Sequence, residues 1–219
     1  PSELILICCT EITDTYANEL RESISSLKID LKIIDGNQSY PGHSRNIGVS
    51  ISKHDILAFL DAKTLPEDRW LIDGYKLLSN RNLEVLWGQT FYEAGGFRTR
   101  ILRAATYGEK PLITIPGSIM QKESFLKVGY FIETARAGED GEWISRSKLM
   151  KIITGIHPNT ISYKGLESIG LLEVVRKWFR NYLEGYSLPH LRSQKDVYFY
   201  FFSIAILLVS YNWNNISYD

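Results

Sequence analysis

Cysteine is scarce in this sequence, and this excludes folds that are stabilised by several disulfides or by a zinc ion bound to four cysteines. The chain of 219 residues has 2 cysteines, Cys8 and Cys9, which are adjacent in an apolar run. Neighbouring side chains on a strand point to opposite faces, so the pair is most simply two small buried residues. A disulfide framework and a zinc site of four cysteines are therefore excluded. We expect a cytosolic, reducing compartment, and the N-terminal residues lack the features of a secretory signal.

Net charge, internal repeats and low-complexity segments are also missing. The 25 basic residues balance the 25 acidic ones, so no overall electrostatic field attracts nucleic acid. Apolar residues make up 44% of the chain, which is long enough for one substantial core and short for two. We therefore expect one main domain and no nucleic-acid partner.

Short apolar strands alternate with helical patterns up to about residue 90. The strand patterns are 4–9, 31–34, 56–60 and 83–91. Apolar residues at helical spacing lie between them, at 12–27, 44–53 and 70–78. This alternation predicts a Rossmann-like α/β fold, in which helices flank a mostly parallel sheet.

The second half of the chain has a less regular pattern. A strand at 112–115 and a turn at 116–118 precede two predicted helices, at 122–128 and 139–151. A further amphipathic helix is predicted from Leu171 to Tyr182. We expect these helices to complete the domain and to begin a C-terminal helical segment.

Polar residues follow three of the predicted strands. They are Thr10 and Glu11 after the first, Asp35 after the second and Asp61 after the third. Each taken alone can equally be an ordinary turn or cap residue. Ligands of α/β sheets bind outside the carboxyl ends of the strands, so the coincidence favours a binding site at this edge.

Three motifs in order resemble the core of family 2 glycosyltransferases, which have the GT-A fold. The run SRNIGVSISKHDILAFLDAKTLPEDRWL (44–71) is similar to the family's Arg-Asn-x-Gly helix, its Asp-x-Asp strand end and the Pro and Trp-Leu that follow. The run PGSIMQKESFLKVGYF (116–131) resembles the acceptor-side segment, and AGEDGEWISR (137–146) the Glu-Asp start of a helix. The resemblance implies a GT-A domain over 1–168 and a C-terminal amphipathic and hydrophobic helical segment over 169–219.

The resemblance also implies which residues bind a UDP- or GDP-linked sugar. On the donor side they are Thr10, Glu11, Asp35, Arg45, Asp61, Lys63, Trp87 and Gly88. On the acceptor side they are Gly117 and Ser118. Arg45 can reach the diphosphate or nearby carboxylates, because a guanidinium matches both, or it can tie the Asp35 loop to its helix.

Inverting transfer requires a base that takes the proton of the acceptor hydroxyl. By resemblance this base is Asp140, with Glu139 beside it. The alternative is that both are first-turn acidic residues that only favour the helix dipole.

Lys63 stands where the family's Asp-x-Asp motif commonly has a metal-binding carboxylate. An ammonium group has no lone pair for Mg²⁺ or Mn²⁺. Three alternatives stay open: Asp61 and another carboxylate hold a cation, Lys63 neutralises the diphosphate without one, or the site only binds. Tyr163 and Lys164 occupy the region where many family members have a metal-binding His, which favours the second alternative.

The segment 197–213 carries no charge. As a helix it would reach about 25 Å, against a hydrocarbon core of roughly 30 Å. Basic residues precede it, at Arg176, Lys177, Arg180, Arg192 and Lys195. Peripheral contact with an anionic membrane is one interpretation, and a buried C-terminal helix is the other.

Together these features predict an inverting glycosyltransferase of the hexosyltransferase type. It would act at the cytosolic face of the membrane, moving a sugar to a lipid-linked or polysaccharide acceptor in cell-surface glycan synthesis. The alternative is a non-catalytic, membrane-associated scaffold or binding protein with the same fold.

Overall fold

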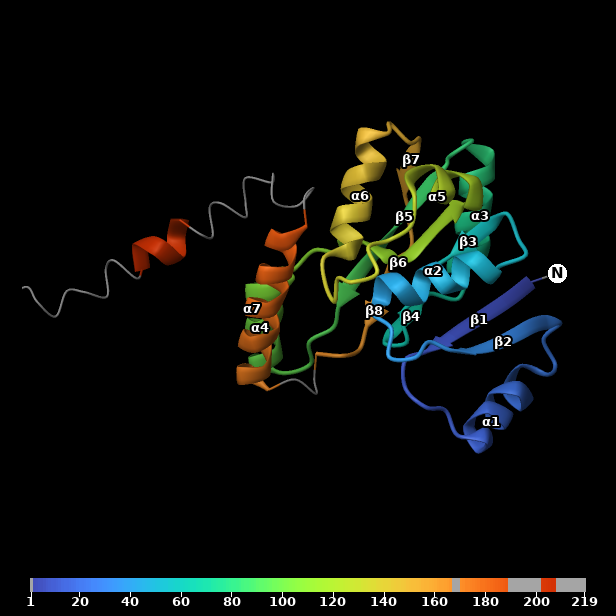
Figure 1. The fold of residues 1–219 in the computed structure, drawn as a ribbon, viewed down its shortest axis with the longest axis horizontal. Coiled ribbons are helices and arrows are strands. Elements are labelled where there is room, and N and C mark those ends of the chain that lie inside the picture. Colours follow the sequence, from blue (N-terminus) through green and yellow to red (C-terminus); the bar gives the residue numbers. More distant parts are fainter. Residues whose placement is uncertain (1, 167–169, 189–201, 208–219) are drawn as a thin grey trace, which may run out of the picture.

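A computed structural model describes residues 2–166, 170–188 and 202–207 of the chain, which form an α/β fold (Figure 1). The chain begins with β1 (Ser2–Cys8), α1 (Asp14–Ile24) and β2 (Ile29–Asp35). The two strands pair in parallel, and their register brings Cys8 beside Asp35 at the carboxyl ends. The side chain of Thr13 caps α1 by accepting a hydrogen bond from the backbone amide of Tyr16.

A larger sheet forms the centre of the molecule. Its strands are β3 (Ile56–Ala58), β4 (Thr64–Pro66), β5 (Val85–Tyr92), β6 (Leu112–Gln121), β7 (Thr154–Ile156) and β8 (Ile161–Tyr163). The strand order is β3-β6-β5-β8-β4, and β7 pairs with β5 beside β8. The long strands β5 and β6 therefore provide the platform on which the remaining elements pack.

Helices cover both faces of the larger sheet. On one face lie α5 (Lys122–Val128) and α6 (Glu139–Leu149), which contact β6. On the other face, α3 (Trp70–Asn80) contacts β5 and β6. Helix α2 (Pro41–Ile51) contacts both β1 and α6, and so joins the N-terminal strands to the larger sheet.

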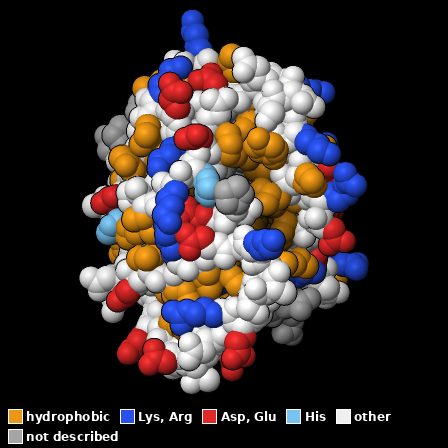
Figure 2. Space-filling view, turned by 90° about the vertical axis from the view of Figure 1, so that its right-hand side faces the viewer, with side chains coloured by type: hydrophobic (Ala, Val, Ile, Leu, Met, Phe, Trp, Pro, Cys, Tyr) orange, Lys and Arg blue, Asp and Glu red, His pale blue; other side chains and the backbone are white. Residues whose placement is uncertain are grey.

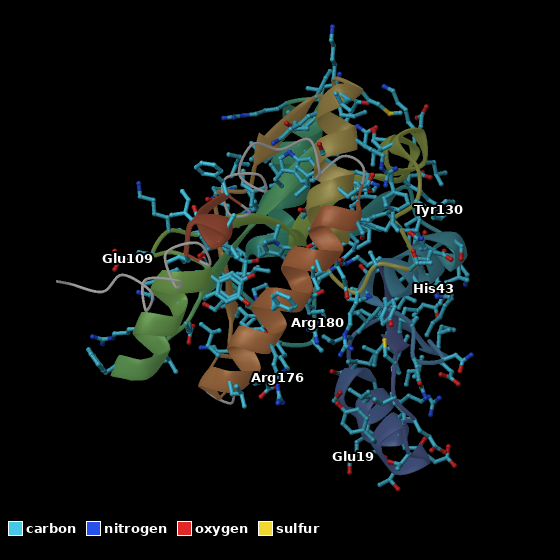
Figure 3. The ribbon with its side chains drawn as sticks, turned by 60° about the vertical axis from the view of Figure 1, so that its left-hand side comes forward. Glu19, His43, Glu109, Tyr130, Arg176 and Arg180 are labelled. Carbon is cyan, nitrogen blue, oxygen red and sulfur yellow. The ribbon has the colours of Figure 1, made fainter. Side chains whose placement is uncertain are left out.

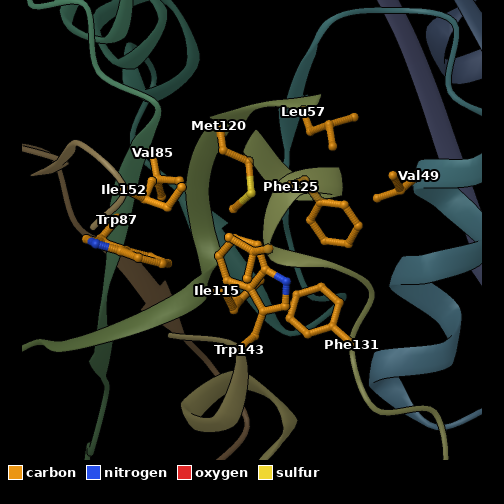
Figure 4. Packing of buried hydrophobic residues seen from close by; sticks show 11 residues of the cluster. Val49, Leu57, Val85, Trp87, Ile115, Met120, Phe125, Phe131, Trp143 and Ile152 are labelled. Carbon is orange, nitrogen blue, oxygen red and sulfur yellow. The ribbon is translucent and has the colours of Figure 1, made fainter. Parts of the chain in front are cut away.

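The core divides into two clusters because successive strand residues point to opposite faces. Val85 and Trp87 belong to the cluster under α5 and α6, whereas Leu86 belongs to the cluster under α3. In the first cluster, the rings of Phe125 and Trp143 stack with centroids 5.5 Å apart (Figure 4). Aromatic rings thus supply much of the apolar surface that fixes α6 on the sheet.

The predicted α/β class is confirmed, but the strand directions are more evenly mixed than the sequence predicted. Among the described strands, three ladders are parallel and three are antiparallel. The difference centres on 116–118, where we predicted a turn and the chain instead continues through β6. Gly88 explains how β5 accommodates this segment, because a Cβ there would lie 2.3 Å from the carbonyl oxygen of Pro116. The register of the β5–β6 ladder shifts at this point.

Four elements were not predicted from the sequence. They are the three-residue strands β4, β7 and β8, and α4 (Phe97–Thr106). The predicted amphipathic helix is present as α7 (Leu171–Ser187). Of the segment 197–213, residues 202–207 are described and helical, and the others lie outside the described residues, as do Arg192 and Lys195. In the described ranges, the structure has no helix of the length and apolar character that a membrane crossing requires.

Candidate active site

Arg45 is the centre of a charge cluster that three parts of the chain build: α2, the turn after β3 and the start of α6. Its side chain, only 10% exposed, donates hydrogen bonds to three carboxylates. The Nη1 atom lies 2.9 Å from Glu139 Oε1 and 2.5 Å from Asp140 Oδ1. The Nη2 atom lies 3.2 Å from Asp61 Oδ1. The structure therefore brings the predicted base, its neighbour and the strand-end carboxylate to one guanidinium.

The sequence around each carboxylate explains its position. Asp61 follows β3 in a tight turn, in which the Thr64 hydroxyl donates to the Asp61 carbonyl and accepts from its amide. Glu139 and Asp140 form the first turn of α6. Gly138 precedes them in the left-handed region, with φ of 88°, and lets the chain turn sharply into the helix. Carboxylates at this end are stabilised by the helix dipole.

Asn46 fixes α2 against the segment that leads into α6. Its amide nitrogen donates to the carbonyl oxygen of Phe131, and its amide oxygen accepts from the Phe131 backbone N–H. Gly42 allows the close approach, since a Cβ there would lie 2.6 Å from the Ile132 carbonyl oxygen. Asn46 therefore holds α2 against this segment by hydrogen bonds, while the neighbouring Arg45 forms ion pairs with the carboxylates at the start of α6.

Burial raises the pKa of two of the carboxylates that share the Arg45 guanidinium. Burial and then the charge of Asp140 raise the pKa of Glu139 to about 7, although Arg45 opposes the shift. Burial also raises the pKa of Asp140; Arg45 acts against this shift and Asp61 adds to it. Burial alone would lower the pKa of Arg45, but the three carboxylates raise it above the ordinary value. Arg45 is therefore a permanent cation, and Glu139 can exchange a proton near neutral pH.

Accessibility distinguishes the two members of the acidic pair. The side chain of Asp140 remains 28% exposed, whereas that of Glu139 is 7% exposed. A small molecule can therefore reach Asp140 more easily than Glu139. The assignment of Asp140 as the base, with Glu139 beside it, stays a prediction.

The loops that carry the strand-end residues are joined to α2, the helix that also carries Arg45. Asp35 is exposed and its Oδ1 accepts from the Asn37 backbone amide, 2.8 Å away. Thr10 and Glu11 are exposed in the loop after β1. The connection to α2 is made by Ser44, whose Oγ lies 2.7 Å from Ser39 Oγ.

The same Ser44 Oγ lies 3.3 Å from the Cys9 sulfur. Ser44, the residue just before Arg45, thus connects the loops that follow β1 and β2 to α2. The alternative in which Arg45 itself ties the Asp35 loop to its helix is wrong, because the Arg45 ion pairs go to Asp61, Glu139 and Asp140.

The residues predicted near the sugar and acceptor lie where the register of the β5–β6 ladder shifts. Trp87 is buried and packs edge-on against Trp143. The buried Ser118 hydroxyl accepts from the Gly88 amide at 2.8 Å and donates to the Thr114 carbonyl at 2.7 Å. Gly117 has φ of 84° and its carbonyl accepts from the Trp70 indole. A role for these residues in sugar or acceptor binding stays a prediction.

The described residues do not fit a bound divalent cation. They contain no group of three or more His, Cys, Asp or Glu side chains arranged to hold a metal. Asp61 already accepts from Arg45, and a metal ion beside it would face that guanidinium across a short distance. Lys63 is exposed and supplies no lone pair. The donor set thus lacks the oxygen ligands that Mn²⁺ or Mg²⁺ prefers.

Three tyrosines beside the carboxylates form a group that the sequence did not reveal as a whole. Tyr92 and Tyr107 stack with ring centroids 3.8 Å apart, and Tyr163 lies 5.1 Å from Tyr92. Burial raises the pKa of Tyr92, and the two other tyrosines and then Asp140 and Asp61 add to the shift. Tyr163 was noted from the sequence, but Tyr107 ends the unpredicted α4, so no pattern placed it here.

The fold is that of GT-A glycosyltransferases, as comparison with solved structures shows. Residues 1–349 of TarS from S. aureus, in complex with UDP-GlcNAc, match with a TM-score of 0.56 at 14% identity. That match covers 85% of this chain and 58% of the other. GalNAc-T7 with UDP, GalNAc and Mn²⁺ matches with a TM-score of 0.52 at 14% identity, over 74% of this chain and 37% of the other.

This chain therefore spans little more than half the length of the TarS fragment that it matches. No protein-family model and no curated protein sequence matches it. The predicted GT-A class is confirmed at the level of the fold.

Proposed function

We propose that this protein is an inverting glycosyltransferase that uses a nucleotide-sugar donor. The single observation that carries the proposal is the position of Arg45, which donates a hydrogen bond through Nη1 to Asp140 and another through Nη2 to Asp61. Asp61 would anchor the donor, while the loops at Thr10, Glu11 and Asp35 would contact the base and ribose. The structures of TarS with UDP-GlcNAc and of GalNAc-T7 with UDP support a UDP-linked sugar as the first donor to test.

Asp140 would act as the general base. In this step its carboxylate takes the proton of the acceptor hydroxyl as that oxygen forms a bond to the anomeric carbon. The bond between this carbon and the diphosphate oxygen breaks, and the nucleoside diphosphate leaves with the electron pair. A base with a raised pKa suits this task, because proton transfer is most efficient near the working pH.

The diphosphate requires positive charge, and the chain offers it without a metal ion. Lys63 follows Asp61 by two residues and is exposed, so its ammonium can neutralise a diphosphate bound there. The ion pairs of Arg45 with all three carboxylates support this metal-independent alternative over ligation by Asp61. The acceptor we propose is a lipid-linked or polysaccharide glycan at the cytosolic membrane face, as the motif resemblance implies.

Titration calorimetry with UDP and GDP, in the presence of EDTA and in the presence of Mn²⁺, tests this proposal. We expect one nucleotide to bind in both conditions, with an affinity that changes less than about threefold. The Lys63→Gln variant should weaken this binding by about tenfold, from loss of one charge-assisted contact. Lys76→Gln, at an exposed position on α3, is the matched control and should bind like wild type.

Absence of binding in both conditions would contradict the proposal and favour the non-catalytic scaffold. Binding that appears only with Mn²⁺ would contradict the metal-independent part alone.

A further inference from the structure

Helix α7 leaves an apolar stripe exposed. The side chains of Leu172, Phe179 and Leu183 are 65%, 63% and 50% exposed, respectively. Separations of seven and four residues place all three on the same face of a helix. Single exposed apolar residues are ordinary on a protein surface, but an aligned set on one helix face indicates a contact surface.

Positive charge accompanies this stripe. Arg176 is exposed and lies on the same helix face, one turn after Leu172. The half-buried Arg180 lies one turn further along α7 than Arg176 (Figure 3). Helix α4 lies next to α7 in both views and carries the exposed Arg100.

The charge on these two helices is unusual for this chain. The sequences of α4 and α7 contain six basic and two acidic residues, a net charge of +4 in a chain whose total is zero. On the face that carries the N-terminal elements, Lys and Arg stand side by side with Asp and Glu (Figure 2). Among the described side chains of α4 and α7, the exposed charges are those of Arg100, Arg176 and Glu173, so positive charge is in excess beside the apolar stripe.

We propose that α7, with α4 beside it, is a docking surface for an anionic lipid bilayer. A helix that presents an apolar stripe edged by arginines lies in the plane of the interface, with the apolar side chains among the acyl chains and the cations at the headgroups. Juxtaposed basic residues are attracted to anionic lipid, and the attraction weakens with salt. The described helix 202–207 also exposes Phe202 and Leu207, so the alternative of a buried C-terminal helix fails for these residues.

This inference does not depend on the proposed chemistry. The stripe and its arginines belong to α7, whereas the Arg45 cluster is built by α2, α6 and the turn after β3. Membrane docking can therefore hold or fail whether or not the chain transfers a sugar.

Co-sedimentation of the full chain with vesicles tests the proposal. We expect binding to phosphatidylcholine vesicles that contain phosphatidylglycerol, and much weaker binding to phosphatidylcholine alone. The double variant Arg176→Gln, Arg180→Gln should lower the partition coefficient roughly thirtyfold, at about fivefold for each basic residue. Phe179→Ser should lower it roughly tenfold through lost apolar burial.

Two matched controls separate docking from general effects. Leu149→Ser removes an apolar side chain of similar exposure, 69%, at the far end of α6. Arg21→Gln with Lys28→Gln removes two exposed charges at the N-terminal unit. Both controls should bind vesicles like wild type, and the circular dichroism spectrum should be unchanged in every variant.

Failure to bind phosphatidylglycerol vesicles would overturn the proposal. Equal binding by the α7 variants and wild type would overturn it as well, because the membrane would then be contacted elsewhere. Binding that depends on Phe179 but not on salt or anionic lipid would also contradict it, and would indicate apolar insertion without recognition of anionic headgroups.

Discussion

Arg45 and Asp140 are 95 residues apart in the sequence, and a hydrogen bond of 2.5 Å joins their side chains. The bond connects the middle of α2 to the first turn of α6. Because Arg45 also binds Asp61, the same guanidinium relates the turn after β3 to both helices. The geometry of the candidate active site therefore depends on one side chain that is almost fully buried.

Removal of the Arg45 charge should destabilise the fold strongly. In Arg45→Gln, the buried Glu139 and the half-buried Asp140 lose their counterion. We expect the free energy of unfolding to fall by about 3–5 kcal/mol, the range for breaking a buried pair. Urea unfolding measures this loss. Arg69→Gln breaks the exposed pair with Asp73 and should leave the urea midpoint nearly unchanged, and an equally small effect at Arg45 would contradict the account.

Stability should fall as the pH rises from about 4.5 to about 7. The folded-state pKa of Glu139 is raised to about 7 from 4.5, mainly by burial, so the folded chain binds more protons than the unfolded chain in this window. The contribution is complete below pH 4.5 and is lost as the pH passes through 7, with a size of the order of 3 kcal/mol.

Urea unfolding of Glu139→Gln across this range provides the check, since a neutral side chain should flatten the profile. The exposed Glu123→Gln should leave the wild-type slope intact. A Glu139→Gln profile parallel to that of wild type would show that burial of this carboxyl does not cause the pH dependence of stability.

Asn46→Ala should loosen the contact between α2 and the segment before α6. The substitution leaves the backbone N–H and carbonyl of Phe131 without their partner, and both lie in a buried environment. The expected loss is about 3 kcal/mol in the free energy of unfolding. Asn18→Ala, which removes one exposed hydrogen bond to Arg21, should cost less than about 1 kcal/mol. Similar losses of stability in the two variants would show that the hydrogen bonds between Asn46 and Phe131 do not hold α2 in place.

Gly88→Ala should be destabilising by about 3 kcal/mol or more. The added Cβ would lie 2.3 Å from the Pro116 carbonyl oxygen, so β5 and β6 must move apart. Gly170→Ala is the matched control, because its Cβ meets nothing within 4 Å and its φ of −73° suits any residue. Thermal unfolding of the two variants gives the comparison, and a Gly88 variant as stable as the control would be inconsistent with this packing.

The regular elements could be predicted because their patterns are local. The helices at 122–128 and 139–151 and the first strands followed from the spacing of apolar residues, and α5 coincides with its predicted range. The turn predicted at 116–118 was wrong because Pro and Gly usually end a strand, and here Gly88 on the neighbouring strand makes room for them. That compensation is a tertiary contact, which no local pattern contains.

The site could be predicted in part for the same reason. The ordered motifs predicted that three residues belong to the site: Arg45, Asp61 and Asp140. Only the structure shows that Arg45 donates hydrogen bonds to both carboxylates. The stack of Tyr92 and Tyr107 depends on α4, which we did not predict although apolar residues recur at helical spacing in its sequence. The short strands β4, β7 and β8 have three residues each, too few for a period to be visible.

The most direct test of the central claim is sugar transfer or donor hydrolysis by wild type and Asp140→Asn, across UDP- and GDP-linked sugars. Nucleotide affinity is measured on the same samples. The account predicts that Asp140→Asn lowers turnover by about a thousandfold while nucleotide affinity changes only about threefold, because a general base acts in the reaction and not in donor binding. Full activity in Asp140→Asn would contradict the assignment of the base and, with it, the proposed mechanism.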